Sequence, residues 1–228
     1  MRKRRKLLLA LGCLVVIAAI VAFVRRDDQP RYRGRELSKW LHDAFSASGA
    51  TGGVDPEQAV RRIGTNAIPW LVSWIRYERG SWQRTARSVL SPSLSKSALG
   101  EFISEETLEE RSVLAVIGFS FLGTNAAPAV PQLATMMQDP TCPQTARRCI
   151  LALGHIGDPA LPVLAQAFSD TNFPYRVEIV ELVPYLRSPH PFGPLLEEAL
   201  ADADARVRSA TTNVLQQIDS AAQSDQNL

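Results

Sequence analysis

Cysteine is scarce in this chain, with three residues among 228. Cys13, Cys142 and Cys149 form no CxxC pair, which argues against a disulfide-stabilised small domain and against a paired zinc site. A disulfide between Cys142 and Cys149 would require Cys142 to lie in a flexible loop. The cysteines are therefore not expected to form a disulfide framework.

Side chains that usually carry catalysis are also few. The histidines His42, His155 and His190 are widely separated, whereas a metal site needs several ligands to converge. Residues 118–123 contain a Gly-x-Ser pattern, but the second glycine stands one place too late for a nucleophile elbow, so Ser120 is expected to pack within a helix. We expect no enzymatic activity, no metal or cofactor and no small-molecule substrate.

Positive charge is concentrated at the N-terminal end. Residues 1–39 contain 11 Lys or Arg and 3 Asp or Glu, whereas the remaining residues contain 14 and 20. A nucleic-acid-binding domain needs a basic stripe on its folded body, so nucleic acid is not an expected partner. Two acidic clusters are expected on the surface at helix ends: Glu101, Glu105, Glu106, Glu109 and Glu110, and Glu197, Glu198, Asp202 and Asp204.

One long apolar run, residues 7–24, contains neither charge nor proline and follows the basic tail 1–6. A helix of this length spans roughly 27 Å, close to the ~30 Å hydrocarbon core of a bilayer. The run predicts an uncleaved transmembrane helix, a signal-anchor. The alternatives are a cleaved signal peptide, whose apolar region usually has about 7–15 residues, and a lipoprotein acylated at Cys13.

The remaining domain boundaries follow from composition. We expect a juxtamembrane linker over 25–36, a helical body over 37–220 with an inserted segment near 79–103, and a polar tail over 221–228. Lys and Arg are equally frequent just before and just after the span, so their count leaves the orientation open. The short, densely charged tail favours a cytoplasmic N-terminus and a body on the non-cytoplasmic side of the membrane.

A short cassette recurs along the body. Leu122-Gly-Thr-Asn-Ala-Ala-Pro128 is nearly repeated at 63–69, is repeated more loosely at 156–162, and has a degenerate copy at 188–194. In each copy a proline stands five residues after the glycine or after Pro189, which replaces it. The glycine is expected to end one helix in a left-handed conformation, Thr and Asn to cap the next, and the proline to occupy its first turn.

Helical hairpins are therefore expected on both sides of each cassette, with Ser38 and Asp55 as N-caps of the first two helices. The expected helices lie at 37–45, 55–63, 66–77, 109–122, 127–138, 144–153, 160–169, 175–186, 194–201 and 205–218. A period near 32–34 residues between the later prolines is typical of a repeat array, because one hairpin cannot bury its apolar face alone.

The residues of the array resemble HEAT repeats over roughly 55–220. The resemblance rests on the Pro143-x-x-x-Arg147 and Asp202-x-x-x-Arg206 starts, the Leu-Gly helix ends at Leu122 and Leu153, and the Gly-x-x-Ala-x-Pro turn. Three features resemble bacterial membrane-anchored HEAT-repeat proteins in particular: the Trp40-Leu41 pair, the string Arg62-Ile-Gly-Thr-Asn-Ala-Ile-Pro-Trp70 and the apolar N-terminal run. The resemblance implies an all-α, right-handed α-solenoid of the Armadillo-like type that binds partners on its concave surface.

The side chains expected to contact a protein partner lie on the second helix of each hairpin: Trp70, Trp74, Arg76, Tyr77, Gln132, Met136 and Gln166. The four tryptophans all fall in the first half of the body, and three interpretations remain for them. They pack the first unit against the Trp40 helix, or they form an aromatic interface of the kind that anchors protein partners. In the third interpretation the aromatic patch, being near the anchor, faces the membrane surface.

The expected function is that of a membrane-anchored, non-catalytic scaffold for a protein partner. One alternative is a bilin lyase, because HEAT-like lyases that attach bilin pigments share this repeat. The other alternative is a mainly structural tether whose polar tail binds elsewhere.

Overall fold

The computed structural model describes residues 29–46, 53–77, 105–187 and 189–226, of which 105–108 and 221–226 are described by their backbone alone. These residues are mostly helical, as predicted, with a single two-stranded hairpin among them. The basic tail 1–6, the predicted anchor 7–24 and the insert near 79–103 lie outside the described residues.

A β-hairpin precedes the helices where a linker was predicted. Strand β1 (Arg31–Tyr32) pairs antiparallel with β2 (Arg35–Glu36). Arg33 and Gly34 between them have φ of 49° and 76°, the positive pair that a two-residue turn matching the strand twist requires. The predicted linker over 25–36 therefore contains a short hairpin at residues 31–36, in which Arg-Gly supplies the turn.

The hairpin leads directly into helix α2 (Leu37–Phe45), which buries Leu37, Trp40 and Leu41. The predicted N-cap Ser38 lies inside this helix, because the helix begins at Leu37. The amide of Ser38 is bound instead by the Oε1 atom of Gln29, at 3.0 Å. Trp40 donates its ring N–H to the carbonyl of Tyr32, so the same side chain joins the hairpin to the helical core.

The remaining helices alternate between two sets. The first helices are α3 (Pro56–Ile63), α8 (Glu105–Leu122), α10 (Pro143–Ile156), α12 (Arg176–Leu182) and α14 (Ala205–Gln226). The second helices are α4 (Ile68–Ile75), α9 (Val130–Met137), α11 (Leu161–Ser169) and α13 (Gly193–Ala199). Each predicted hairpin is thus present, although its boundaries differ by a few residues.

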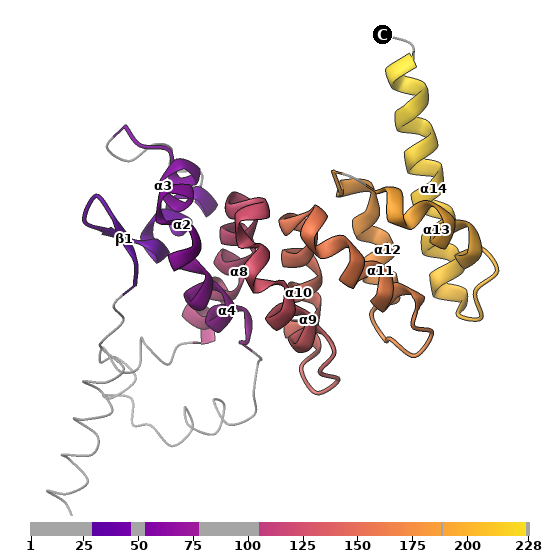
Figure 1. The fold of residues 1–228 in the computed structure, drawn as a ribbon, viewed down its shortest axis with the longest axis horizontal. Coiled ribbons are helices and arrows are strands. Elements are labelled where there is room, and N and C mark those ends of the chain that lie inside the picture. Colours follow the sequence, from indigo (N-terminus) through magenta and orange to yellow (C-terminus); the bar gives the residue numbers. More distant parts are fainter. Residues whose placement is uncertain (1–28, 47–52, 78–104, 188, 227–228) are drawn as a thin grey trace, which may run out of the picture.

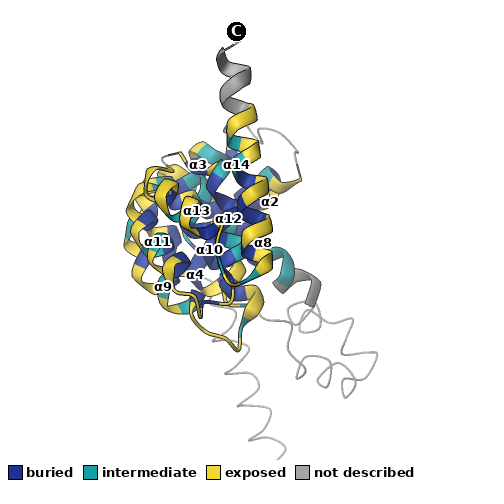
Figure 2. Cartoon of the chain, turned by 90° about the vertical axis from the view of Figure 1, so that its right-hand side faces the viewer, coloured by how far each residue is buried: buried dark blue, intermediate teal, exposed yellow. Residues whose placement is uncertain are grey.

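The two sets form two layers. The first helices contact one another in chain order, and each second helix packs against the first helix that follows it. Figure 1 shows the units following one another from α2 to α14. In the view along this row, α9 and α11 lie on one side and α2 and α8 on the other, with buried residues between them (Figure 2). Apolar side chains from both layers share one continuous core.

The cassettes form short 3₁₀ turns between the layers. Turn η1 (Gly64–Ala67), η2 (Gly123–Ala129) and η3 (Asp158–Ala160) follow glycines 64, 123 and 157, or begin at them, with φ of 63°, 52° and 80°. The left-handed glycines confirm that part of the prediction. Neighbouring turns touch one another, and the alanine three places after each glycine, at 67, 126 and 160, is fully buried. In these three turns the small alanine side chain lets neighbouring turns lie close together.

Side-chain capping in the cassettes was predicted wrongly. Asp55 does cap α3, accepting a hydrogen bond from the amide of Glu57 at 3.3 Å. No Thr or Asn side chain caps the turns η1 and η2 or the helices that follow them. The chain passes from the glycine into a 3₁₀ turn, whose own backbone bonds take up amides that a cap would otherwise bind.

The degenerate fourth cassette closes a 3₁₀ turn with a similar hydrogen bond, although Pro189, in place of glycine, has a φ of −74° and is not left-handed. Turn η5 (His190–Phe192) closes with the amide of Phe192 donating to the carbonyl of Pro189 at 2.8 Å, as the amide of Ala160 does to Gly157. Phe192 stands where the other units have alanine and is fully buried against Phe168. The exposed face of the last first helix, α14, is polar up to Ser220, which is typical of the end of a repeat array.

Among the described residues one stretch, Glu109–Met137, is long and apolar enough to cross a membrane by length and composition. It is not one uninterrupted α-helix, because Gly123 has a positive φ and the turn η2 separates α8 from α9. In its most apolar window 44% of the residues are buried inside the protein. We therefore interpret this stretch as a core hairpin, which meets the same criterion.

Candidate functional site

Three of the four second helices lack charged residues. Helices α4, α9 and α11 contain no Asp, Glu, Lys or Arg, whereas every first helix contains at least two such residues. Their exposed positions carry proline, serine, threonine and glutamine instead: Pro69, Ser73, Pro131, Gln132, Thr135, Pro162, Gln166 and Ser169. We call these residues the second-helix face. The uncharged surface ends at α13, which carries Glu197 and Glu198.

The predicted aromatic site divides into core and surface. Trp74 is only 7% exposed and its ring lies 5.9 Å from the Arg111 guanidinium, so this side chain belongs to the packing between α4 and α8. Trp70 is half-buried at the edge of the core. Tyr77 is half-buried as well, and its carbonyl accepts a hydrogen bond from Arg148 of α10. Arg76 is exposed. The tryptophan Trp82 lies outside the described residues.

The other predicted partner residues lie on the next two second helices. Gln132 and Met136 stand one turn apart on α9, the first exposed and the second half-buried against the core. Gln166 is exposed on α11. The predicted residues therefore lie on, or directly after, successive helices of one layer. Among them Trp74 is the one classed as buried.

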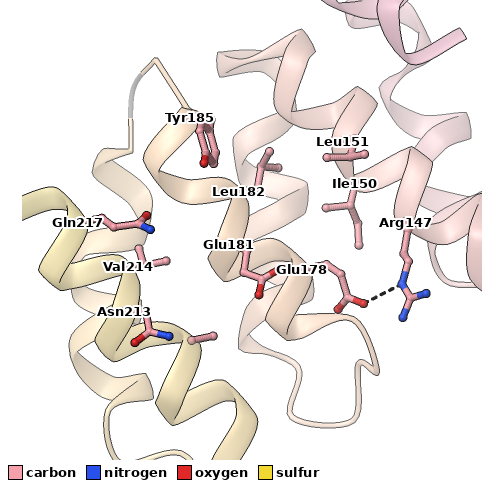
Figure 3. A pocket seen from close by; sticks show the side chains of 11 residues that line it. Arg147, Ile150, Leu151, Glu178, Glu181, Leu182, Tyr185, Asn213, Val214 and Gln217 are labelled. Carbon is pink, nitrogen blue, oxygen red and sulfur yellow. Dashed lines mark hydrogen bonds and ion pairs between the residues drawn. The ribbon is translucent and has the colours of Figure 1, made fainter. Parts of the chain in front are cut away.

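A groove that the sequence did not predict lies on the opposite layer, over α12 (Figure 3). We call it the α12 groove. It has a volume of about 570 Å³, and its lining comes from α10, from α12 with the turn after it, and from α14. The lining residues are Arg147, Ile150, Leu151, Glu178, Glu181, Leu182, Tyr185, Ala210, Asn213, Val214 and Gln217.

The α12 groove combines an apolar base with polar edges. Figure 3 shows Leu182 and Glu181 between Ile150 on one side and Val214 on the other. Arg147 donates to Glu178 across the groove at 2.9 Å, which neutralises that carboxylate. Tyr185 is 80% exposed, an unusual position for an aromatic side chain.

Proline explains why α12 ends beside this groove. The sequence predicts one helix over 175–186, yet α12 ends at Leu182 and a 3₁₀ turn, η4 (Val183–Tyr185), follows. Pro184 cannot donate a backbone hydrogen bond, and its ring is incompatible with a helix interior. The sequence signal for this early helix end was a proline ten residues into the predicted helix, followed by tyrosine.

Comparison with known proteins adds no relative to these observations. The sequence matches no family model, and neither curated proteins nor solved structures gave a match. The two surfaces are therefore interpreted from their own chemistry.

Side chains considered for catalysis have structural partners. Ser120 lies inside α8 and donates to the carbonyl of Ile117 at 2.8 Å. His42 binds Glu110 at 2.5 Å, joining α2 to α8. Across the described ranges, no three side chains of His, Cys, Asp or Glu gather closely enough to hold a metal ion.

The exposure of one acidic residue was predicted wrongly from the sequence. Asp202, predicted as a solvated carboxylate, has a side chain only 8% exposed and forms an ion pair with Arg176. The hydrogen bond from Arg176 holds the pKa of Asp202 below its usual value. Cys149 is fully buried in α10, and burial raises the pKa of its thiol to about 12. Cys142 and Cys149 are both free thiols.

Proposed function

We propose that this chain is a membrane-anchored, non-catalytic scaffold whose helical hairpins form a right-handed, HEAT-like α-solenoid. Residues 7–24 anchor it, and the body lies on the non-cytoplasmic side. The second-helix face, with Trp70, Arg76 and Met136 at its edges, binds a protein partner. Two observations support the solenoid: the helices are arranged in two layers, and the cassette turns stack on one another.

The absence of charge from α4, α9 and α11 is the observation that carries the binding proposal. Protein interfaces differ from other surfaces chiefly because their centres are depleted of charged residues and enriched in aromatic side chains and methionine. Lys, Glu and Asp are rarely buried, so a surface without them loses little when a partner removes water from it. The first-helix layer, which carries the charges, has no such property.

Crosslinking in native membranes tests the proposal. Gln132→Lys combined with Gln166→Lys places two charges on the second-helix face, and both positions are exposed, so folding is retained. We expect the proteins crosslinked to the wild-type chain to be lost from this variant. The matched control is Gln144→Lys with Gln216→Lys, two exposed glutamines on first helices, which should keep the captured proteins. Equal capture by wild type and both variants would exclude this face as the binding site.

The anchor and the alternatives have separate tests. If residues 7–24 span the membrane, the protein resists alkaline extraction, and protease added to the non-cytoplasmic side digests the body. A bilin lyase would shift the absorbance of an added bilin when titrated with the full chain. A tether would lose its partner on deletion of residues 221–228 and keep it when the second-helix face is charged.

A further inference from the structure

The α12 groove has the shape of a helix-binding site. Its residues from α12 and the following turn are Glu178, Glu181, Leu182 and Tyr185, which repeat at i, i+3, i+4 and i+7 and so form one face of that element. The lining residues of α10 and α14 repeat with the same spacing on either side. Each lining segment covers up to two helical turns, roughly 10 Å.

We propose that the α12 groove binds an amphipathic α-helix of a partner protein, with apolar residues on its buried face and a Lys or Arg opposite Glu181. A helix suits this groove because the lining follows one face of α12 and the turn after it for up to two turns, and residues of α10 and α14, which both contact α12, flank it on either side.

The apolar part of the groove suits the buried face of such a helix. Leu182 and Val214 form its base, and Leu151, 44% exposed, stands at its edge. Tyr185 is positioned to cover the end of a bound helix with its ring. Partly exposed tyrosines and leucines beside a preformed groove are the features that helix-in-groove recognition uses.

Charge selects a basic partner. Glu178 is already neutralised by Arg147, whereas Glu181 is exposed and forms no ion pair with any residue that the structure describes. The groove therefore presents one uncompensated negative charge beside an apolar base. A partner Lys or Arg there gains an ion pair, and a partner carboxylate meets repulsion.

Binding of designed helices to the full-length protein in detergent tests the inference. One fluorescein-labelled, stapled helix carries leucine at i, i+3, i+4 and i+7 with arginine beside that stripe. A second has glutamate in place of arginine, and a third has the same composition with the stripe scrambled. We expect anisotropy titrations to show the basic helix binding about 10-fold more tightly than the acidic helix.

Substitutions in the groove separate this site from others. Tyr185→Ala and Glu181→Lys should each weaken the basic helix about 10-fold, and Glu181→Lys should reverse the preference in favour of the acidic helix. Phe45→Ala is the matched control, because Phe45 is an aromatic residue 56% exposed on α2 and should leave binding unchanged. This groove lies on the layer opposite the second-helix face, so the inference does not depend on the proposed function.

Three results would overturn the inference. The scrambled helix could bind as tightly as the designed one, or Tyr185→Ala and Glu181→Lys could leave binding unchanged. Equilibrium sedimentation could also reveal a dimer of the wild type that Tyr185→Ala dissociates, which would assign the groove to a second copy of this chain.

Discussion

Arg176 joins three elements through a single buried side chain. Its Nη2 atom donates to the Oδ2 atom of Asp202 at 2.5 Å, and its Nε atom donates to the carbonyl of Phe168 at 2.8 Å. The two charged side chains are 9% and 8% exposed. The start of α12 is thereby tied both to the end of α11 and to the loop before α14, at the edge of the array opposite the cassette turns.

Removing either member of this pair should destabilise the protein strongly. Arg176→Ala or Asp202→Ala leaves an unpaired buried charge, which costs about 3 kcal/mol of the free energy of unfolding. The double variant should lose less than the sum of the single losses, because the second substitution removes the unpaired charge that the first one leaves. Chemical denaturation of the full-length protein measures these values.

The exposed pair between Arg206 and Asp204 is the control for this experiment, since the Arg206 side chain is 78% exposed. Arg206→Ala should leave the free energy of unfolding unchanged within error, because solvent screens such pairs. An effect of Arg176→Ala no larger than that of Arg206→Ala would contradict the importance of the buried pair.

Acid should weaken the same contact. The hydrogen bond from Arg176 lowers the pKa of Asp202 in the folded protein, so this carboxyl contributes stability above its unfolded pKa of about 3.9. That contribution is lost as the pH falls through the lower, folded pKa. Asp202→Asn should therefore make stability less dependent on pH in this range. Some dependence should persist, because hydrogen bonds also lower the pKa of Asp139 and Asp204.

Close packing at Gly154 should make alanine destabilising there. A Cβ atom at this position would lie 2.5 Å from the Cδ2 atom of Leu182, which forms the base of the α12 groove. We expect Gly154→Ala to cost about 1–3 kcal/mol and to displace Leu182. Gly193→Ala is the matched control, because nothing lies within 4 Å of its added Cβ and its φ is −50°. Thermal unfolding that is equal for both variants would contradict the close contact.

The two described cysteines should differ in reactivity. Burial raises the pKa of the Cys149 thiol to about 12, so almost no thiolate exists there near pH 8. Cys142 is partly exposed and should react with iodoacetamide well before Cys149. Peptide mass spectrometry of the folded protein at pH 8 measures both rates. Labelling of Cys149 as fast as that of Cys142 would show that α10 opens locally.

The sequence predicted the helices because three signals agreed locally: Gly64, Gly123 and Gly157 end helices, proline follows five residues later, and the apolar period is helical. The sequence did not predict whether a side chain is buried where that depends on contacts between residues distant in the chain. Asp202 resembles any exposed carboxylate until Arg176, 26 residues away, is brought beside it. Trp74 could be assigned to core or surface only after α8 was placed against α4.

Part of the two proposed binding surfaces could be predicted from the sequence. Helical spacing places Gln132 and Gln166 on the outer side of second helices, and both side chains are exposed there; their role in binding stays a prediction. The α12 groove forms between three helices, and no local sequence pattern predicts how these helices are positioned relative to one another. The lining residues, such as Leu151 and Asn213, belong to no recognisable sequence motif. They are brought together only by the arrangement of α10, α12 and α14.

The stacked cassette turns have a mechanical consequence. Along their edge η1 contacts η2 and η2 contacts η3, and each turn has a fully buried alanine, so neighbouring units are packed closely there. Along the opposite edge the described units are joined by short connections, such as residues 138–142 and 170–175, and by side-chain contacts such as Arg176 to Asp202. Bending of the helical body should therefore change the distances between units at the edge that contains Arg176 and Asp202. The distances between units at the cassette turns should stay nearly constant. A bound protein that spans several second helices would then be held by a body that changes its curvature without changing its spacing at the turns.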